Sequence, residues 1–361
     1  MKKFIITHLF IIVIFSANLF AQPSATYYNN AEGKTGVQLR IALFQIISPH
    51  TNVGYGGLYD VYETSDVTPD GKVWDMYSTC VWIPNVKKCG SYSNVCDCYN
   101  REHSIPQSWF NEANPMVADA FHVYPTDGKV NGQRSNHPFG ECANGVKCDN
   151  NAHALGKLGT STFSGYSSTV FEPDDEYKGD FARTYFYMAT CYADKNFTSG
   201  QGDVVFTYSS SGNPKCNLTN YAVNLFLKWS RQDPVSQKEI DRNNAIDNHQ
   251  HNRNPFIDFP ELGEYIWGDS IGYVWHSNSP SAIEEVKFST LEIYPNPVET
   301  ELVVSGQWLV VSDVQIFDIT GKTVLATHYS LLTTNSIDVS NLPQGLYFIK
   351  INNQIGKFIK K

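Results

Sequence analysis

Two short segments decide the fold of this chain: NREHSIPQSWF at residues 100–110 and DGKVNGQRSN at residues 127–136. The first segment contains Glu102 and His103 side by side. If the second segment folds as a short helix, Asn131 and Arg134 share one of its faces, because residues three apart are neighbours on a helix surface. We therefore expect both segments to contribute to one site that combines a histidine, oxygen ligands and a cation.

These residue types are the ones that phosphodiester hydrolysis needs near neutral pH. A histidine can take a proton from water, and carboxylate and amide oxygens bind Mg²⁺. A metal ion and an arginine stabilise charge on phosphorus and on the leaving oxygen. Two motifs of other hydrolytic sites are missing: there is no H-E-x-x-H and no Walker-type loop, and the nearest histidine pair, His249 and His251, has the wrong spacing for zinc.

The composition is that of a folded, multidomain protein. The chain has 361 residues, of which 42% are hydrophobic and 17% charged, and this excludes a disordered chain or a coiled coil. Residues 22–285 hold 19 Lys plus Arg against 30 Asp plus Glu, a balance of −11. Because nucleic-acid affinity comes mostly from cations that meet phosphates, activity on nucleic acid would need a local basic groove or a bound metal.

The first 21 residues read as a secretory signal peptide. Lys2 and Lys3 precede an apolar run, and small residues lead to a cleavage position after Ala21. The run is shorter than the roughly 20 unbroken apolar residues that a membrane anchor needs. No later segment is apolar enough to span a bilayer, so we expect an exported protein with no integral membrane segment after signal removal.

Eight cysteines agree with export, because all of them lie between positions 80 and 216. An even number of cysteines in one exported domain indicates disulfides. A thiolate zinc site is the rival interpretation, but the spacings of Cys96 with Cys98 and of Cys142 with Cys148 do not form C-x₂-C knuckles. Eight cysteines allow 105 pairings, so their connectivity stays open.

Composition divides the chain into a signal peptide (1–21), a mixed domain (22–276), a linker (277–287) and a C-terminal module (288–361). The linker, SNSPSAIEEVK, is polar and free of cysteine. Downstream, short β-branched and aromatic runs alternate with turn signals, which predicts a small all-β module. The large domain is expected to be α+β. One helix is predicted from Asp180 to Cys191, and another is predicted to begin at Asp233-Pro234.

Residues 22 to about 275 resemble the secreted endonuclease I family of non-specific nucleases, whose catalytic unit is a ββα-metal finger. The segments that carry the resemblance are WDMYS (74–78), REHSIPQSWF (101–110), YPTDGKVNGQRSNHPFG (124–140), FEP (171–173), KGDFAR (178–183), FYM (186–188) and NRNPFID (252–258). The resemblance implies that His103 is the general base and that Glu102 and Asn131 hold one Mg²⁺, with Mn²⁺ or Ca²⁺ as alternatives. It implies DNA and RNA as substrates and 5′-phosphate products.

Two features of this site need explanation. Successive strand residues point to opposite faces, so Glu102 and His103 can serve one site only if the strand ends or bulges there. Some members of the family also place a phosphate-binding arginine between the histidine and the asparagine, and residues 104–130 contain none. Arg134 and Arg253 are the predicted replacements, with Arg101 as a third candidate.

The C-terminal 75 or so residues resemble the sorting domain of the type IX secretion system. The matching segments are YPNP (294–297), DITGK (318–322), LPQGLY (342–347) and the basic end KFIKK (357–361). The resemblance implies an immunoglobulin-like sandwich that directs the protein across the outer membrane to the medium or the cell surface. The function predicted is that of a secreted, metal-dependent endonuclease, and the alternative is a non-catalytic adhesin or nucleic-acid-binding module.

Overall fold

The computed structural model describes residues 23–277, 293–304, 312–319, 321–329, 336–351 and 354–361. The chain divides into two compact units, Met1–Ser279 and Pro280–Lys361, which are described separately. The predicted signal peptide and nearly all of the predicted linker lie outside the described residues. Within the described part, no helix combines the length and apolar character needed to cross a bilayer.

The larger unit is mainly helical, with short pairs of strands. Its helices are α1 (Gly36–Ile47), α2 (Gly54–Ser65), α3 (Gly128–Arg134), α4 (Lys178–Cys191), α5 (Asn220–Gln232), α6 (Gln237–Gln250), α7 (Pro255–Asp258) and α8 (Leu262–Trp267). Its strands are β1 (Tyr99–His103), β2 (Val123–Asp127), β3 (Lys157–Thr160), β4 (Thr169–Glu172), β5 (Phe206–Tyr208) and β6 (Cys216–Leu218), which pair as three antiparallel hairpins. The mixed α and β character predicted from the sequence is confirmed.

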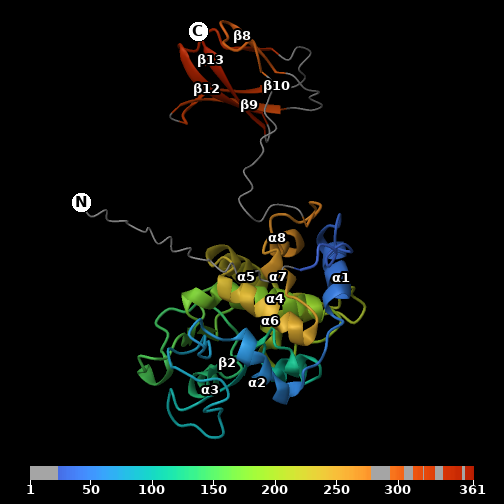
Figure 1. The fold of residues 1–361 in the computed structure, drawn as a ribbon, viewed down its shortest axis with the longest axis vertical. Helices are drawn as coiled ribbons and strands as arrows, with labels where there is room; N and C mark the ends of the chain where they lie inside the picture. The colour runs from blue at the N-terminus through green and yellow to red at the C-terminus, as the bar shows by residue number, and fades with distance from the viewer. Residues whose placement is uncertain (1–22, 278–292, 305–311, 320, 330–335, 352–353) are drawn as a thin grey trace, which may run out of the picture. The chain divides into compact units, whose positions relative to one another are not determined.

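Helix α4 is the centre of the larger unit (Figure 1). All 14 of its residues are buried, and it packs against α1, α5 and α7. Burial on every side forces its polar residues to find partners. The guanidinium of Arg183 donates to both carboxylate oxygens of Glu239 on α6, at 2.5 and 2.8 Å. Helix α4 thus contacts several of the surrounding helices and links them into one core.

Helix α6 begins later than the sequence predicts. Its N-cap is Ser236, which forms a capping box with Glu239. Asp233 instead follows the last residue of α5, and its carboxylate accepts a hydrogen bond from the backbone N–H of Gly179 at 2.7 Å. The predicted start at Asp233-Pro234 was therefore wrong, because Ser236 offers a reciprocal cap that satisfies two backbone N–H groups.

Strands β1 and β2 and helix α3 form a β-β-α unit that includes parts of both segments, 100–110 and 127–136. Strands β1 and β2 pair antiparallel, and Asp127, the last residue of β2, is also the N-cap of α3. Its carboxylate accepts hydrogen bonds from the backbone N–H groups of Lys129 and Val130, each at 2.9 Å. Figure 1 shows β2 and α3 at the end of the larger unit away from α8. This cap fixes the direction in which α3 leaves the hairpin.

Two disulfides hold the loop that precedes β1. Cys80 is bonded to Cys96, and Cys89 to Cys98. The other four cysteines, Cys142, Cys148, Cys191 and Cys216, are buried free thiols. The prediction that cysteines form disulfides is confirmed for the first four, and the backbone N–H of Gly128, at the start of α3, donates to Cys98 O at 2.9 Å. The bonded loop is therefore attached directly to α3.

The described residues of the smaller unit are mainly in strands. One sheet has the order β10-β9-β12-β13 and the other the order β11-β8-β7. The strands are β7 (Ile293–Tyr294), β8 (Glu301–Val304), β9 (Ser312–Asp318), β10 (Thr323–Tyr329), β11 (Ser336–Asp338), β12 (Gly345–Ile351) and β13 (Gln354–Lys360). Leu302 and Ile337 of the second sheet share a core with Ile316 and Phe358 of the first. The predicted strand-rich module is confirmed.

Candidate active site

Strand β1 places Glu102 and His103 on opposite faces of the hairpin. Glu102 pairs with Tyr124 and His103 with Val123, in a regular register from Tyr99 onward. No bulge separates the two residues, but the strand ends at His103. A strand end was one of the two arrangements, a strand end or a bulge, that would let both residues serve one site. The two side chains therefore lie on opposite faces of β1, next to the point where the strand ends.

Glu102 is buried on the face of β1 that α3 covers. Its Oε1 accepts hydrogen bonds from the Tyr77 hydroxyl and from Arg134 Nη1, each at 2.9 Å. Burial raises the pKa of Glu102 to about 7, although the charge of Arg134 and the Tyr77 hydroxyl act in the opposite direction. No donor in the described part of the chain reaches Oε2 of Glu102, so one carboxylate oxygen remains available as a ligand.

Asn131 lies on the same side as Glu102. Its Nδ2 donates to Oδ1 of Asn100 at 2.8 Å, and Asn100 and Glu102 share a face because they are two residues apart on a strand. Arg134, one helical turn from Asn131, bonds Glu102 itself. The amide donates through nitrogen, which leaves Oδ1 of Asn131 free. A carboxylate oxygen and an amide oxygen are hard ligands, so this donor set fits Mg²⁺, Mn²⁺ or Ca²⁺.

His103 lies against α2 and the turn before β2. Its Nε2 is 2.9 Å from Val117 O, and since a carbonyl oxygen can only accept, this nitrogen carries the proton. The lone pair of the neutral ring is then on Nδ1, which no donor in the described residues reaches. Burial, with a smaller effect of His122, lowers the pKa of His103 to about 3. The ring is thus neutral at physiological pH and able to accept a proton.

Arg134 is a structural partner of both catalytic candidates. Its side chain is 1% exposed, and Nη1 donates to Glu102 Oε1 and to His103 O, each at 2.9 Å. Nη2 donates to Ser104 O at 2.6 Å. These contacts use most of its donors to hold the end of β1. They favour a positioning role over direct contact with a phosphate.

Arg253 belongs to a different cluster. It donates to both carboxylate oxygens of Asp258, at 2.8 and 2.7 Å, and to Asn244 and Asp247. None of these partners contacts Glu102, His103 or Asn131. The carboxylates, led by Asp258, raise the pKa of Arg253 in spite of its burial. The structure therefore does not bring Arg253 to the other predicted site residues.

Arg101 is the arginine on the His103 side of β1. Its guanidinium lies over the ring of Tyr55, with 3.5 Å between Cζ and the ring centroid, and Nη1 donates to Tyr55 O at 2.7 Å. The same Tyr55 ring is 5.8 Å from the His103 ring. Nη2 has no partner within the described residues. Arg101 therefore shares the His103 face of β1 and keeps Nη2 without an internal partner, while its guanidinium and the His103 ring both lie near Tyr55.

Sequence reasoning did not assign roles to two tyrosines of this site. Tyr77, which donates to Glu102, lies in the WDMYS segment that carries part of the family resemblance. A hydroxyl group in a segment of this kind is a weak sign of a contact with the site. Tyr55 lies in a glycine-rich segment, GYGGLYD, which gives no sign that its ring will support Arg101 and His103. Both contacts depend on the tertiary fold.

Other clusters of metal-ligand type lie elsewhere. Among the described residues, one group of three such side chains comes together, namely Cys80, Cys96 and Asp127. The two sulfurs are bonded to each other, so they offer no thiolate, and Asp127 caps α3. This cluster is therefore part of the framework around the site rather than a metal centre.

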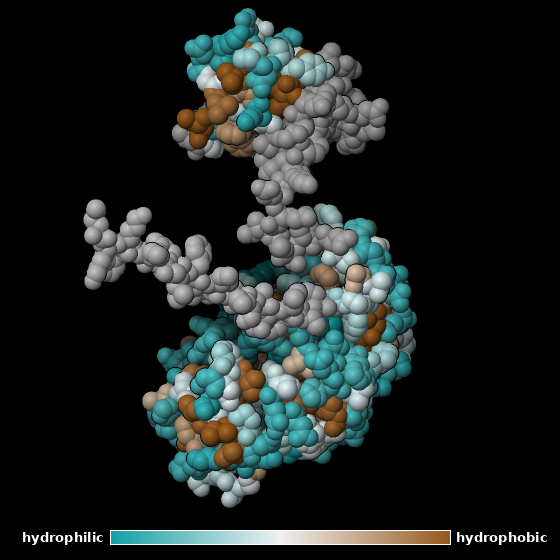
Figure 2. Space-filling model, viewed as in Figure 1, coloured by the Kyte–Doolittle hydropathy of each residue, from teal (hydrophilic) through white to brown (hydrophobic). Residues whose placement is uncertain are grey.

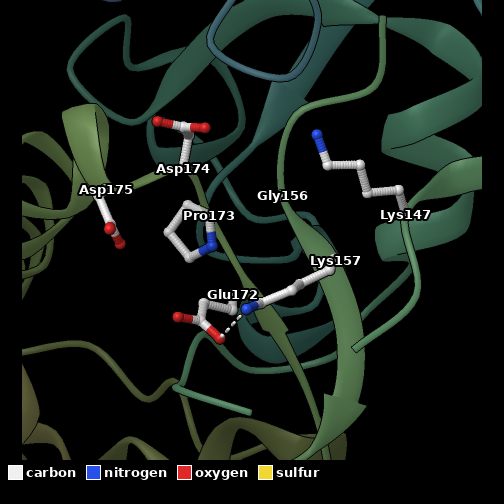
Figure 3. A pocket seen from close by; sticks show the side chains of 7 residues that line it. All are labelled: Lys147, Gly156, Lys157, Glu172, Pro173, Asp174 and Asp175. Atoms are coloured by element: carbon white, nitrogen blue, oxygen red, sulfur yellow. Dashed lines mark ion pairs between the residues drawn. The ribbon is translucent and has the colours of Figure 1, made fainter. Parts of the chain in front are cut away.

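A polar hollow of about 190 Å³ lies beside β3 and β4 (Figure 3). Inside it, Glu172 pairs with Lys157 at 3.3 Å, and Lys178 contacts the same carboxylate at 2.8 Å. Figure 3 shows Asp174 and Asp175 beside this pair. Glu172 itself is buried. Lys147, the other lysine of the lining, has no ion-pair partner among the described residues, but the carboxylates of Glu172, Asp174 and Asp175 outnumber the two lysines.

Two protein-family models match separate parts of this chain. The family model for endonuclease I matches residues 35–261, and the model for the secretion system C-terminal sorting domain matches residues 292–361. The first match contains the whole β1–β2–α3 unit. The second covers all the strands of the smaller unit.

Individual proteins are similar to the larger unit. An extracellular ribonuclease of Bacillus amyloliquefaciens is 36% identical over 253 residues, which are 68% of this chain and 80% of the relative. An extracellular ribonuclease of Bacillus subtilis is 34% identical, with 67% of this chain and 78% of the relative covered. A periplasmic deoxyribonuclease of Aeromonas hydrophila is 24% identical, with 63% and 86% covered.

Proposed function

Because the chain belongs to the endonuclease I family and is a nuclease, we propose that it is a secreted, metal-dependent endonuclease. In this proposal it cuts both DNA and RNA and leaves 5′-phosphate ends. Its relatives include proteins named as ribonucleases and as a deoxyribonuclease. A site that contacts the phosphate and not the base would act on both polymers. The C-terminal sorting domain agrees with delivery to the medium or the cell surface.

The observation that carries this proposal is the position of Glu102 and His103 on opposite sides of the end of β1. In phosphoryl transfer, the attacking and leaving oxygens lie roughly in line on opposite sides of phosphorus. A phosphodiester at the strand end would face His103 on one side and Glu102 with Asn131 on the other. The arrangement therefore suits attack from the His103 side and departure of the 3′ oxygen on the Glu102 side.

The residues have separate tasks in this proposal. Glu102 Oε2 and Asn131 Oδ1 hold the divalent ion, which when bound supplies positive charge to a phosphate oxygen and to the leaving oxygen. His103 accepts a proton from water at Nδ1, since Nε2 is held by Val117 O. Arg134 keeps the end of β1 and the Glu102 carboxylate in place.

Arg101 is the arginine that we propose contacts the phosphate, in place of Arg134 and Arg253. Arg101→Ala should lower kcat/KM by about tenfold, which corresponds to the loss of one charged hydrogen bond that is partly exposed to water. Arg231→Ala is the control, because Arg231 is also a surface arginine and pairs with Glu264 and Asp269. Equal rates for the two variants would remove Arg101 from the site.

The function is tested by incubating the purified chain with supercoiled plasmid and with structured RNA. We expect nicking and then linearisation in Mg²⁺ and no cleavage in EDTA, with activity restored by added Mg²⁺. Fragment ends should accept radioactive phosphate from a kinase only after phosphatase treatment, because they carry 5′-phosphates.

The adhesin alternative gives the opposite result in the same assay. A folded, oxidised chain that binds the plasmid but does not cut it in Mg²⁺, Mn²⁺ or Ca²⁺ would contradict the proposed activity. Cleavage in EDTA at an undiminished rate would instead contradict the role of the metal ligands, Glu102 and Asn131.

A further inference from the structure

A pocket of about 370 Å³ lies on the outer side of α3, the helix that carries Asn131. It is lined by Tyr92, Lys129, Gly132, Gln133, Cys148 and Asp149. Its volume is in the range of small-molecule sites, about 300–1,000 Å³. Nothing in the activity argued above uses it, although a helix is only about 10 Å across and the candidate metal ligand is therefore close.

One wall of this pocket is the ring of Tyr92, which packs against α3. A Cβ atom on Gly132 would lie 2.7 Å from the Tyr92 hydroxyl, and one on Gly128 would lie 3.0 Å from Tyr92 Cδ1. The two glycines are one turn apart, so the ring lies along α3 where larger side chains would displace it. Tyr92 is nevertheless 37% exposed. One face of the ring thus packs on the helix while part of the ring remains open to solvent.

The loop that carries Tyr92 is fixed before any ligand binds. Cys89, three residues earlier, is bonded to Cys98, and a Cβ on Gly128 would also come within 2.5 Å of Cys89 Sγ. An aromatic surface held in this way loses little conformational entropy on binding. It has the properties of a stacking platform.

The pocket also holds groups that recognise a nucleotide. Lys129 on α3 is paired with Asp149 at 3.4 Å; the Lys129 side chain is partly exposed, at 32%, and that of Asp149 is exposed, at 54%. A surface pair of this kind is weak, so a phosphate can replace the carboxylate. Gln133, one turn after Lys129, has no hydrogen-bond partner in the described part of the chain and can donate to or accept from a base or sugar.

We propose that this pocket binds a nucleotide of the substrate strand outside the cleaved bond, with its base stacked on Tyr92 and its phosphate on Lys129. The inference rests on the proposed nuclease function and adds a binding subsite to it. Stacking on an aromatic ring is tolerant of sequence, because every base has a π face. The subsite would therefore strengthen binding of a polymer without creating a sequence preference.

The test measures binding apart from cleavage, in the full chain carrying His103→Ala and in EDTA. The probe is a fluorescein-labelled single-stranded DNA of about twelve nucleotides, within the usual site size of single-strand binders. Tyr92→Ala should weaken binding about tenfold, and Tyr92→Phe should bind like the parent. Tyr208→Ala is the matched control, because Tyr208 is 38% exposed and lies on β5.

A strand of the same length made of abasic sugar–phosphate units separates stacking from structural damage. If Tyr92 stacks a base, Tyr92→Ala should leave the affinity for the abasic strand unchanged. Equal losses on both strands, or equal affinities of Tyr92→Ala and Tyr208→Ala for the normal strand, would overturn the proposal.

Removing one surface carboxylate gives a second test that does not depend on the packing of Tyr92. Asp149→Asn should tighten binding of the normal strand by about two- to fivefold, since Lys129 loses its competitor. Asp194→Asn, which frees Lys195 from a similar exposed pair at 2.8 Å, changes the net charge equally and should have a smaller effect. Equal effects of the two variants would overturn the placement of the phosphate at Lys129.

Failure of this inference can be told apart from failure of the proposed function. If the wild-type chain cuts plasmid while the Tyr92 and Asp149 variants bind like their controls, only the subsite is wrong. If the wild-type chain does not cut plasmid in any divalent metal, the nuclease function is wrong as well.

Discussion

His103→Ala is expected to lose hydrolysis by a factor of about 10²–10⁴, the usual contribution of a positioned general base. The neutral ring has its proton on Nε2, held by Val117 O, so Nδ1 is the nitrogen that can accept a proton from water. Removal of the ring leaves the ligands Glu102 and Asn131 in place. The loss should therefore appear in kcat, with little change in the affinity for uncut DNA.

The control for this variant must also remove a buried histidine. His50 has a side chain only 2% exposed, and its Nδ1 lies 2.9 Å from Ser48 O, which resembles the contact of His103 with Val117. His50→Ala should lower the stability of the fold but leave the rate per folded molecule unchanged. If His103→Ala turns over at the rate of His50→Ala, His103 is not the base.

Glu102→Gln is expected to abolish measurable metal binding and to lower the free energy of unfolding by about 3–5 kcal/mol, the cost of leaving a buried charge without its partner. Glu102 and Arg134 are both fully enclosed, at 3% and 1% exposure of their side chains. The glutamine retains an oxygen that can accept from Tyr77 and Arg134. The variant thus removes the negative charge with a minimal change of shape.

A double variant separates the two roles of Glu102. Combining Glu102→Gln with Arg134→Met removes the unpaired cation, so part of the lost stability should return, less the hydrogen bonds of Arg134 to His103 O and Ser104 O that methionine cannot make. Metal binding should not return, because the carboxylate is still missing. Calorimetric titration with Mg²⁺ and urea unfolding in EDTA measure the two effects, and recovery of metal affinity in the double variant would exclude Glu102 as a ligand.

The β-β-α unit was expected from the family resemblance, while the residues themselves suggested only its short helix; the structure shows that its determinants are local. The N-cap at Asp127 and the pairing of β1 with β2 need only neighbouring residues and one hairpin. The same is true of the smaller unit, whose strands alternate with turn signals. The start of α6 was mispredicted because Asp233-Pro234 and Ser236 are both good local caps. The capping box of Ser236 and the contact of Asp233 with Gly179 on another helix together favour the start at Ser236.

The roles of the arginines could not be predicted in this way. Arg134 is joined to a residue 32 positions earlier, and Arg101 rests on a ring 46 positions earlier. Packing between distant segments decides which guanidinium has all or most of its N–H groups bonded inside the protein and which has N–H groups without a partner. The sequence identifies the candidate arginines, but only the structure shows which of them keep N–H groups available to a substrate phosphate.

The positions of the two disulfides bear on how the exported chain acquires its covalent structure. Both bonds join cysteines within residues 80–98, at separations of 16 and 9 residues. Four cysteines allow three pairings where eight allow 105. Because chains emerge with the N-terminal part first, this loop can oxidise before Cys142 and the later thiols arrive. Folding then encloses Cys191 and Cys216, at 1% and 0% exposure, and protects the first pairs from exchange.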